Sequence, residues 1–279
     1  MARWKLLDLK FIVGVLCIGT IIFLAAFGWL LSPHDASEQN LMFALEPPWN
    51  FSEGYVLGTD HLGRDILARM ISGARVSLAI AGAVVVLSGV VGVLIGALSG
   101  YLSGNRDMLI QKVVETFWAF PPVLLAIAVL AFMGQSLTNI IFALTLQRWI
   151  PYCRIARAQA LTIRSKEYIA ASKIMGGGTL WILRRHVLPN VTASAIIVAT
   201  FTMATAILAE SSLSFLGLGV PPSVPTWGGM LAEGRSYITR AWWLAVFPGL
   251  GIFITVLGLN LLGDWLRDQF DPKAGLNLV

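Results

Sequence analysis

Long stretches without any charged residue most constrain how this chain can fold. Residues 76–105 contain no Asp, Glu, Lys or Arg. A helix needs about 20 mostly apolar residues to cross the hydrocarbon core of a bilayer. The whole chain is 57% hydrophobic and 13% charged, with a mean hydropathy of +0.76, whereas soluble domains have about 25% charged residues. The sequence therefore predicts an all-α integral membrane protein.

The apolar runs predict six membrane-spanning helices in a single domain that covers residues 1–279. We expect Phe120-Pro121-Pro122 to kink the third span or to mark its entry, because proline cannot continue the helical hydrogen bonding. A short amphipathic helix is predicted from Asp65 to Ser72, and a short loop over residues 101–112. The expected spans are residues 11–31, 76–100, 113–133, 138–157, 190–210 and 241–263.

Lysine and arginine predict the orientation of these spans. If the N-terminus is inside, the inner segments hold 15 of the 20 basic residues. Cytoplasmic loops carry such an excess, so we expect both termini and the loop 158–189 in the cytoplasm. Residues 32–75 and 211–240 are then expected outside, as periplasmic loops. The net charge of +5 reflects this topology and does not indicate nucleic-acid binding.

Residues 167–190 interrupt the apolar pattern with a stretch that has its own structure. The sequence predicts one helix over residues 165–175 and a second over 179–187. Three glycines, 176–178, separate them, and glycine readily takes the left-handed conformation that ends a helix. Pro189 suits the first turn of the helix that follows.

This stretch resembles the cytoplasmic loop that defines the permease subunits of ATP-binding cassette (ABC) importers. That loop reads roughly Glu-Ala-Ala, three residues, Gly, nine residues and Ile-x-Leu-Pro. Ala170-Ala171-Ser172 stand at the first three positions, so the family's glutamate is absent, and Gly176 stands at the glycine. His186-Val187-Leu188-Pro189 match the end, and Glu167-Tyr168 upstream match the dipeptide, oligopeptide and nickel branch. A solvated helical hairpin is the alternative, but the agreement of spacing, glycine and Leu-Pro favours the docking loop.

Three further segments resemble the same branch. Residues 57–78 contain Gly58-Thr59-Asp60 and Gly63-Arg64-Asp65, residues 211–228 contain Ser-Phe-Leu-Gly-Leu-Gly and Trp227-Gly228, and residues 260–272 match the closing sequence. The resemblance implies the type I importer permease fold. It also implies a second homologous permease, two ATPase subunits that bind ATP and magnesium, and a substrate-binding protein. The residues implied to couple to an ATPase are Glu167, Tyr168, Ala170, Ala171, Ser172, Gly176, Leu188 and Pro189.

Catalytic and cofactor motifs are missing from the sequence. It has no phosphate-binding Gly-x-x-x-x-Gly-Lys-Ser/Thr, no His-Glu-x-x-His, no Gly-x-Ser-x-Gly and no Cys-x-x-Cys. We therefore expect no enzyme activity and no cofactor in this chain. Asp60, His61 and Asp65 make a poor metal site, and a turn cap or ion pair is the better interpretation of Asp60.

Two observations bear on the translocation path. Glu210, with Ser211 and Ser212, is expected at the outer end of the fifth span, bordering the path, with helix capping or an ion pair as the alternative. Arg148 is expected either to snorkel towards the cytosol or to face the bundle interior. Gly92, Gly96 and Gly100 are expected to allow a neighbouring helix to approach, and Gly104 to form a turn.

The resemblance makes a permease of a bacterial inner-membrane peptide importer the leading hypothesis. Nickel, opine or glutathione-like substrates are alternatives with the same architecture. A self-sufficient secondary transporter is a weaker hypothesis, because such proteins carry ionisable residues or inverted repeats in their spans. A membrane enzyme is disfavoured for want of a catalytic constellation.

Overall fold

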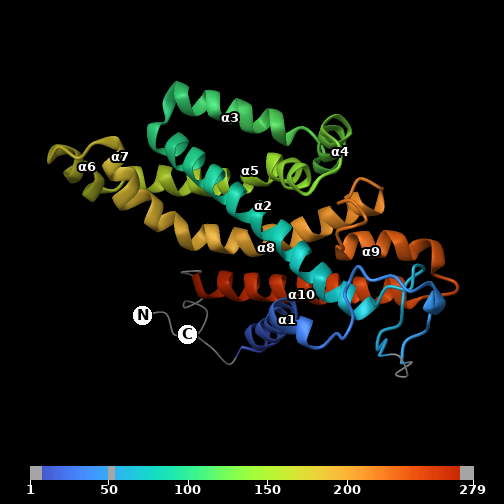
Figure 1. Cartoon of the computed structure of the whole chain (residues 1–279). Helices are drawn as coiled ribbons and strands as arrows, with labels where there is room; N and C mark the ends of the chain where they lie inside the picture. The colour runs from blue at the N-terminus through green and yellow to red at the C-terminus, as the bar shows by residue number, and fades with distance from the viewer. Residues whose placement is uncertain (1–7, 50–53, 271–279) are drawn as a thin grey trace.

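The computed structural model describes residues 8–49 and 54–270, and this part of the chain is almost entirely helical. Five long helices run the length of the molecule, with α3 and α4 beside them (Figure 1). The long helices are α1 (Leu9–Phe27), α2 (Ile66–Leu102), α5 (Leu137–Arg164), α8 (Leu188–Phe215) and α10 (Trp243–Phe270). The shorter ones are α3 (Gly104–Trp118), α4 (Pro122–Met133), α6 (Glu167–Ile174), α7 (Thr179–Ile182) and α9 (Trp227–Gly234).

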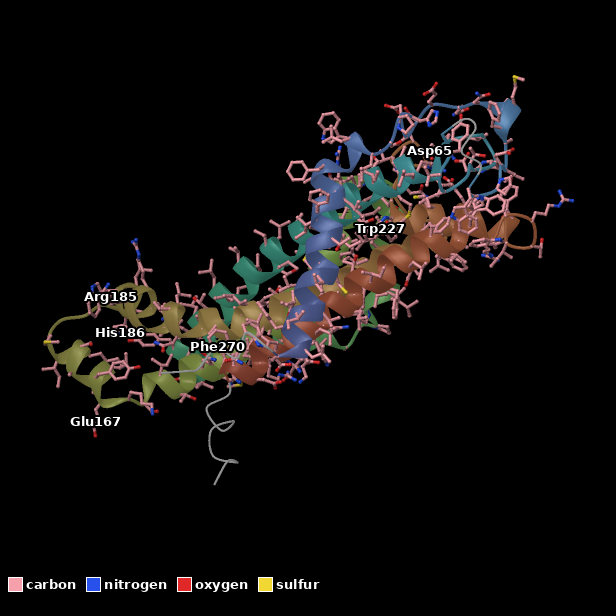
Figure 2. All side chains as sticks on the ribbon, turned by 90° about the horizontal axis from the view of Figure 1, so that it is seen from below. Asp65, Glu167, Arg185, His186, Trp227 and Phe270 are labelled. Carbon is pink, nitrogen blue, oxygen red and sulfur yellow. The ribbon has the colours of Figure 1, made fainter. Side chains whose placement is uncertain are left out.

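The two ends of the molecule are built differently. Helices α6 and α7 form one end, and α9 with the segment before α2 forms the other (Figure 1). Figure 2 shows Glu167 and His186 at the first end and Asp65 at the second, with Phe270, the last residue of α10, nearer the first. The predicted coupling loop and the predicted outer loops therefore lie at opposite ends.

Helices α2 and α5 form the central contact of the bundle. A Cβ added at Gly92 would lie 2.2 Å from the Trp149 carbonyl oxygen, and one at Gly96 would lie 2.2 Å from that of Cys153. One at Gly100 would lie 2.4 Å from the Arg157 carbonyl oxygen. The glycines allow backbone-to-backbone approach, as small residues do in membrane helix pairs, and the packing prediction is confirmed. Gly104 has a φ of +67° and lies at the turn between α2 and α3.

Helices long and apolar enough to cross a membrane number four in the described part of the chain. They are Leu9–Leu30, Ile66–Leu102, Thr179–Phe215 and Trp243–Phe270. Together, α3 and α4 make a fifth candidate, bent by 82°. Four arginines, from Arg148 to Arg164, lower the hydropathy of α5, although its 28 residues are long enough to span.

The third expected span, 113–133, is wrong as a single straight helix. Helix α3 ends at Trp118, and α4 begins at Pro122. Pro121 and Pro122 lack backbone N–H groups, and each disfavours helical geometry in the residue before it. The break expected at Phe120-Pro121-Pro122 is confirmed, but the loop predicted over 101–112 is wrong because α3 already begins at Gly104.

Two predicted separations between helices are also wrong. The amphipathic helix from Asp65 to Ser72 is the first part of α2, and Asp65 caps it by accepting hydrogen bonds from the Leu67 and Ala68 N–H groups. The second helix of the loop does not stop before the fifth span. A π-helical turn, Leu183–Val187, joins α7 to α8. Pro189 lies in the first turn of α8, as expected, and the wider π turn fits a position where one backbone donor is missing.

Candidate coupling surface and outer sites

Helix α6 is anchored to the bundle by one face. The Ile169 side chain is fully buried in a cluster with Ile182 and Val187 from the returning chain. Ala97 of α2 and Ala160 of α5 belong to the same cluster. The end of the molecule is therefore packed onto the long helices, so that a displacement of α6 would be transmitted to α5 and α8.

Ser172 lies on this buried face. Its side chain is 6% exposed, and its Oγ donates to the Tyr168 carbonyl oxygen over 2.7 Å and lies 3.5 Å from His186 Nε2. The expectation that Ser172 offers a contact surface is therefore wrong. Ala170 and Ala171 are exposed. Of the other predicted coupling residues, Glu167, Tyr168, Gly176 and Pro189 are exposed, and Leu188 is half-buried.

The opposite side of α6 and α7 exposes large apolar side chains. The exposed fractions are 87% for Ile174, 80% for Met175, 78% for Leu180 and 51% for Trp181. Lys173, Arg184 and Arg185 are exposed near them. We call Ile174, Met175, Leu180 and Trp181 the apolar tip. Contiguous exposed apolar side chains rimmed by charge mark interaction surfaces. The sequence analysis missed these residues, although apolar pairs on both sides of the three glycines were a visible signal.

The three glycines differ in what they do. Gly176 has a φ of +89°, the left-handed conformation expected to end α6. A Cβ at Gly177 would lie 2.7 Å from the Ser172 carbonyl oxygen, whereas one at Gly178 would meet nothing within 4 Å. The turn therefore depends on Gly176 for conformation and on Gly177 for space.

At the other end, Glu210 lies beneath α9. Its side chain is 1% exposed, and Ser214 Oγ donates to its Oε1 over 2.8 Å. A Cβ at Gly228 of α9 would lie 3.0 Å from Glu210 Oε2 and 2.5 Å from Ser211 Cα. Ser211 is also buried, and Ser212 is exposed. Glu210 and Ser211 thus face α9, and Ser212 alone of the three faces outward.

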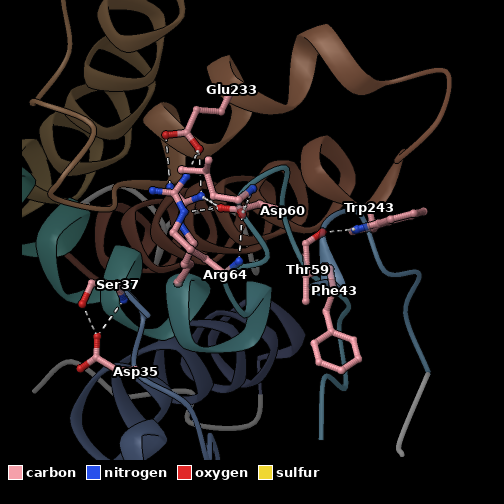
Figure 3. A network of polar contacts seen from close by, with 10 residues as sticks. Asp35, Ser37, Phe43, Thr59, Asp60, Arg64, Glu233 and Trp243 are labelled. Carbon is pink, nitrogen blue, oxygen red and sulfur yellow. Dashed lines mark hydrogen bonds and ion pairs between the residues drawn. The ribbon is translucent and has the colours of Figure 1, made fainter. Parts of the chain in front are cut away.

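An ion-pair network joins the segment before α2 to α9 (Figure 3). Arg64 Nε lies 2.5 Å from Asp60 Oδ2, and Arg64 Nη2 lies 3.0 Å from Glu233 Oε2. Arg69 Nη1 contacts the same two carboxylates. Burial opposes ionisation of Asp60, but the Arg64 backbone N–H and the charges of Arg69 and Arg64 outweigh it and hold its pKa below the usual value.

This network answers the question of a metal at Asp60. The ligand atoms of Asp60, His61 and Glu233 lie within 4.8 Å of one another, whereas Asp65 caps α2 instead. Two arginines already balance the two carboxylates, so a cation has no charge left to neutralise. The turn cap expected for Asp60 is confirmed, because its Oδ1 accepts from the Leu62 and Arg64 N–H groups.

Comparison with known proteins connects these features to a family. Residues 92–275 match the family described as "Binding-protein-dependent transport system inner membrane component". The chain belongs to this family. The permease is therefore an inner-membrane, multi-pass component of such a transport system and not its catalytic subunit.

Curated relatives match almost the whole permease. The di/tripeptide transport system permease protein DppC of Pseudomonas aeruginosa is 44% identical over 93% of this chain and 87% of its own length. The oligopeptide transport system permease protein OppC of Bacillus subtilis is 38% identical over 98% and 90%. The glutathione transport system permease protein GsiD of Pectobacterium atrosepticum is 41% identical over 91% and 83%.

A solved structure agrees with the fold. A chain of the inward-facing MetNI methionine ABC transporter superposes with a TM-score of 0.59 at 20% identity, covering 73% of the permease and 97% of that chain. At this identity the likeness shows the fold alone, which is that of an ABC importer permease.

Proposed function

We propose that this permease is one of two homologous subunits that form the translocation path of a bacterial importer for dipeptides and oligopeptides. A binding protein delivers the peptide from outside, and two ATPase subunits on the cytoplasmic side hydrolyse ATP. The peptide class is supported by the relatives named for di/tripeptide and oligopeptide transport. Glutathione is itself a tripeptide, so the relative named for its transport belongs to the same chemical class.

We also propose six spans with both ends in the cytoplasm. Helix α5 supplies the crossing beyond the five candidates, since its 28 residues suffice for a bilayer. The α6–α7 end is then cytoplasmic, and the α9 end with segments 32–65 and 216–242 is periplasmic. Of the outer serines and Glu210, the exposed Ser212 is the residue that we place beside the path.

The apolar tip is the observation that carries the coupling role. Four large side chains beyond the ends of α5 and α8 are left facing solvent, although the same cluster of residues is otherwise well packed. An ATPase groove that covers them would remove about 25 cal/mol of unfavourable free energy for each Å² of apolar surface. Exposed Glu167, Ala170 and Ala171 would lie along the same contact, with charge steering the approach.

Uptake by the assembled transporter tests the proposal. The permease, its partner permease, the ATPases and the binding protein are reconstituted in proteoliposomes with a labelled dipeptide. We expect uptake that requires ATP, the binding protein and this permease together. Failure to move any peptide, with a binding protein that demonstrably holds one, would contradict the proposed substrate class.

A separate experiment tests the docking surface. Leu180→Asp places a charge in the apolar tip and should reduce co-purification of the ATPase subunits about tenfold or more, because an uncompensated buried charge is costly. Ser165→Asp, at an exposed position between α5 and α6, is the control and should retain them. Equal recovery of ATPase with both variants would count against the apolar tip as the docking surface.

A further inference from the structure

Arg148 is a cation in the middle of a helix that we place in the membrane. It lies near the centre of the 28-residue α5. None of the ion pairs formed by the described residues includes it. A charged side chain at this depth is costly in lipid and normally faces a partner or a water-filled path. Arg148 therefore requires an explanation that the fold alone does not give.

The guanidinium is held in one orientation by α8. Arg148 Nη1 donates to Thr205 Oγ1 over 2.5 Å, and Nη2 donates to the Thr205 carbonyl oxygen over 3.1 Å. The Thr205 hydroxyl in turn donates to the Phe201 carbonyl oxygen over 2.9 Å. A guanidinium has five N–H donors, so most of them have no partner among the described residues. The group is positioned but not neutralised.

A cavity opens directly beside it. The cavity has a volume of about 480 Å³ and lies where the bend between α3 and α4 faces α5. Its walls are apolar except for Gln147 and Arg148, and include Trp118, Phe120, Pro122 and Pro151. Gln147 Nε2 donates to the Phe117 and Phe120 carbonyl oxygens, each over 2.8 Å, and so holds the bend open. Ligand sites commonly combine an apolar wall of this size with a few polar groups.

We propose that Arg148 binds the C-terminal carboxylate of a peptide in transit, with a peptide side chain resting against the apolar wall of the cavity. Planar guanidinium and carboxylate groups pair through two parallel hydrogen bonds. The carboxylate is common to all unmodified peptides, and an apolar wall without further charged groups accepts side chains of many kinds. The inference rests on the proposed peptide importer and adds the group that its path recognises.

Substitution in the complete transporter gives the first test. Arg148→Gln should lower dipeptide uptake about tenfold, in line with the loss of a charged hydrogen bond. Arg148→Lys should retain part of the uptake, and Arg75→Gln, at an exposed position on α2, should change it little. Normal uptake with Arg148→Gln would overturn the proposal.

Charge can be restored chemically as a second test. Arg148→Cys is made in a chain whose native Cys17 and Cys153 are replaced, and the assembled transporter is treated with methanethiosulfonates that add an ammonium, a neutral hydroxyl or a sulfonate. Only the ammonium should restore uptake, and dipeptide supplied with the binding protein and ATP should slow the modification. Equal restoration by all three reagents would assign Arg148 a space-filling role and overturn the proposal.

Two outcomes identify other partners. If Arg148→Gln prevents the two permeases from co-purifying, the guanidinium pairs with a carboxylate of the second permease, and the carboxylate-binding proposal is wrong. If the unaltered complex moves no peptide at all, the proposed function itself fails, which the Arg148 variants do not decide.

Discussion

At Gly96, the hydrogen that replaces a side chain is what allows two helices to meet. A Cβ at this position would lie 2.2 Å from the Cys153 carbonyl oxygen, which is far inside van der Waals contact, and backbone cannot move aside as a flexible side chain can. Positions of this kind cannot be recognised by glycine content alone, because glycine is generally frequent in membrane helices. The spacing of four residues was the informative signal.

We predict that Gly96→Ala lowers the stability of the permease by about 1–3 kcal/mol, because overpacking forces α2 and α5 apart. The measurement is thermal unfolding of the detergent-solubilised protein, followed by tryptophan fluorescence. Gly82→Ala is the control on the same helix, since a Cβ there meets nothing within 4 Å. Unfolding of both variants at the same temperature would show that the close approach at Gly96 is unimportant.

The Asp60 carboxylate gives a prediction about pH. Its folded pKa is held below the usual value, so it contributes stability that is present above the unfolded pKa and is lost as the pH falls through the folded pKa. Stability owed to Asp60 should therefore be constant near neutrality and decline below about pH 4. Asp60→Asn should lower stability at pH 7 by about 3–5 kcal/mol, because it leaves Arg69 and Arg64 underpaired.

Unfolding measured at pH 7 and pH 4 checks this result. The exposed Glu38→Gln is the control and should behave as the unaltered protein does at both pH values. A variant at Asp60 that loses as much stability as the unaltered protein between pH 7 and pH 4 would contradict the assignment.

At the scale of elements, the sequence predicted helices well and their junctions poorly. Apolar runs define α1, α2, α8 and α10 because lipid and core both require apolar side chains. The bend between α3 and α4 was visible as Pro121-Pro122, but its angle depends on how α4 packs on α5, which is a tertiary property. The union of α7 with α8 was missed because a π turn carries no strong sequence signal. The apolar tip was missed because exposed and buried apolar residues look alike in sequence.

The turn after α6 allows the glycines to be tested separately. Gly176→Ala should cost about 1–2 kcal/mol locally, because an alanine at a φ of +89° is strained. The strain should shift the apolar tip and weaken ATPase co-purification, while Gly178→Ala, with open space around its Cβ, should not. Co-purification with purified ATPase subunits is the measurement, and indistinguishable recovery for both variants would show that the turn tolerates other geometries.

At the scale of the whole molecule, α5 decides the topology. If α5 crosses the bilayer, the turn before it and the α6 helix after it lie on opposite sides, and if it does not, they lie on the same side. Its arginines weaken the hydropathy signal, yet Arg157 pairs with Asp107 over 2.7 Å and Arg148 is bound to Thr205, so much of the charge is compensated within the bundle. Helix α5 also has the most extensive contact with α2, itself a candidate span. We therefore predict that α5 crosses. Gln135→Cys, Ser223→Cys and Ala171→Cys, all at exposed positions, are introduced singly into a chain lacking Cys17 and Cys153 and expressed without partner subunits. A membrane-impermeant maleimide should label positions 135 and 223 in intact spheroplasts, and position 171 only after permeabilisation. Labelling of positions 135 and 171 together in intact spheroplasts would mean that α5 does not cross and that Arg148 never enters the membrane.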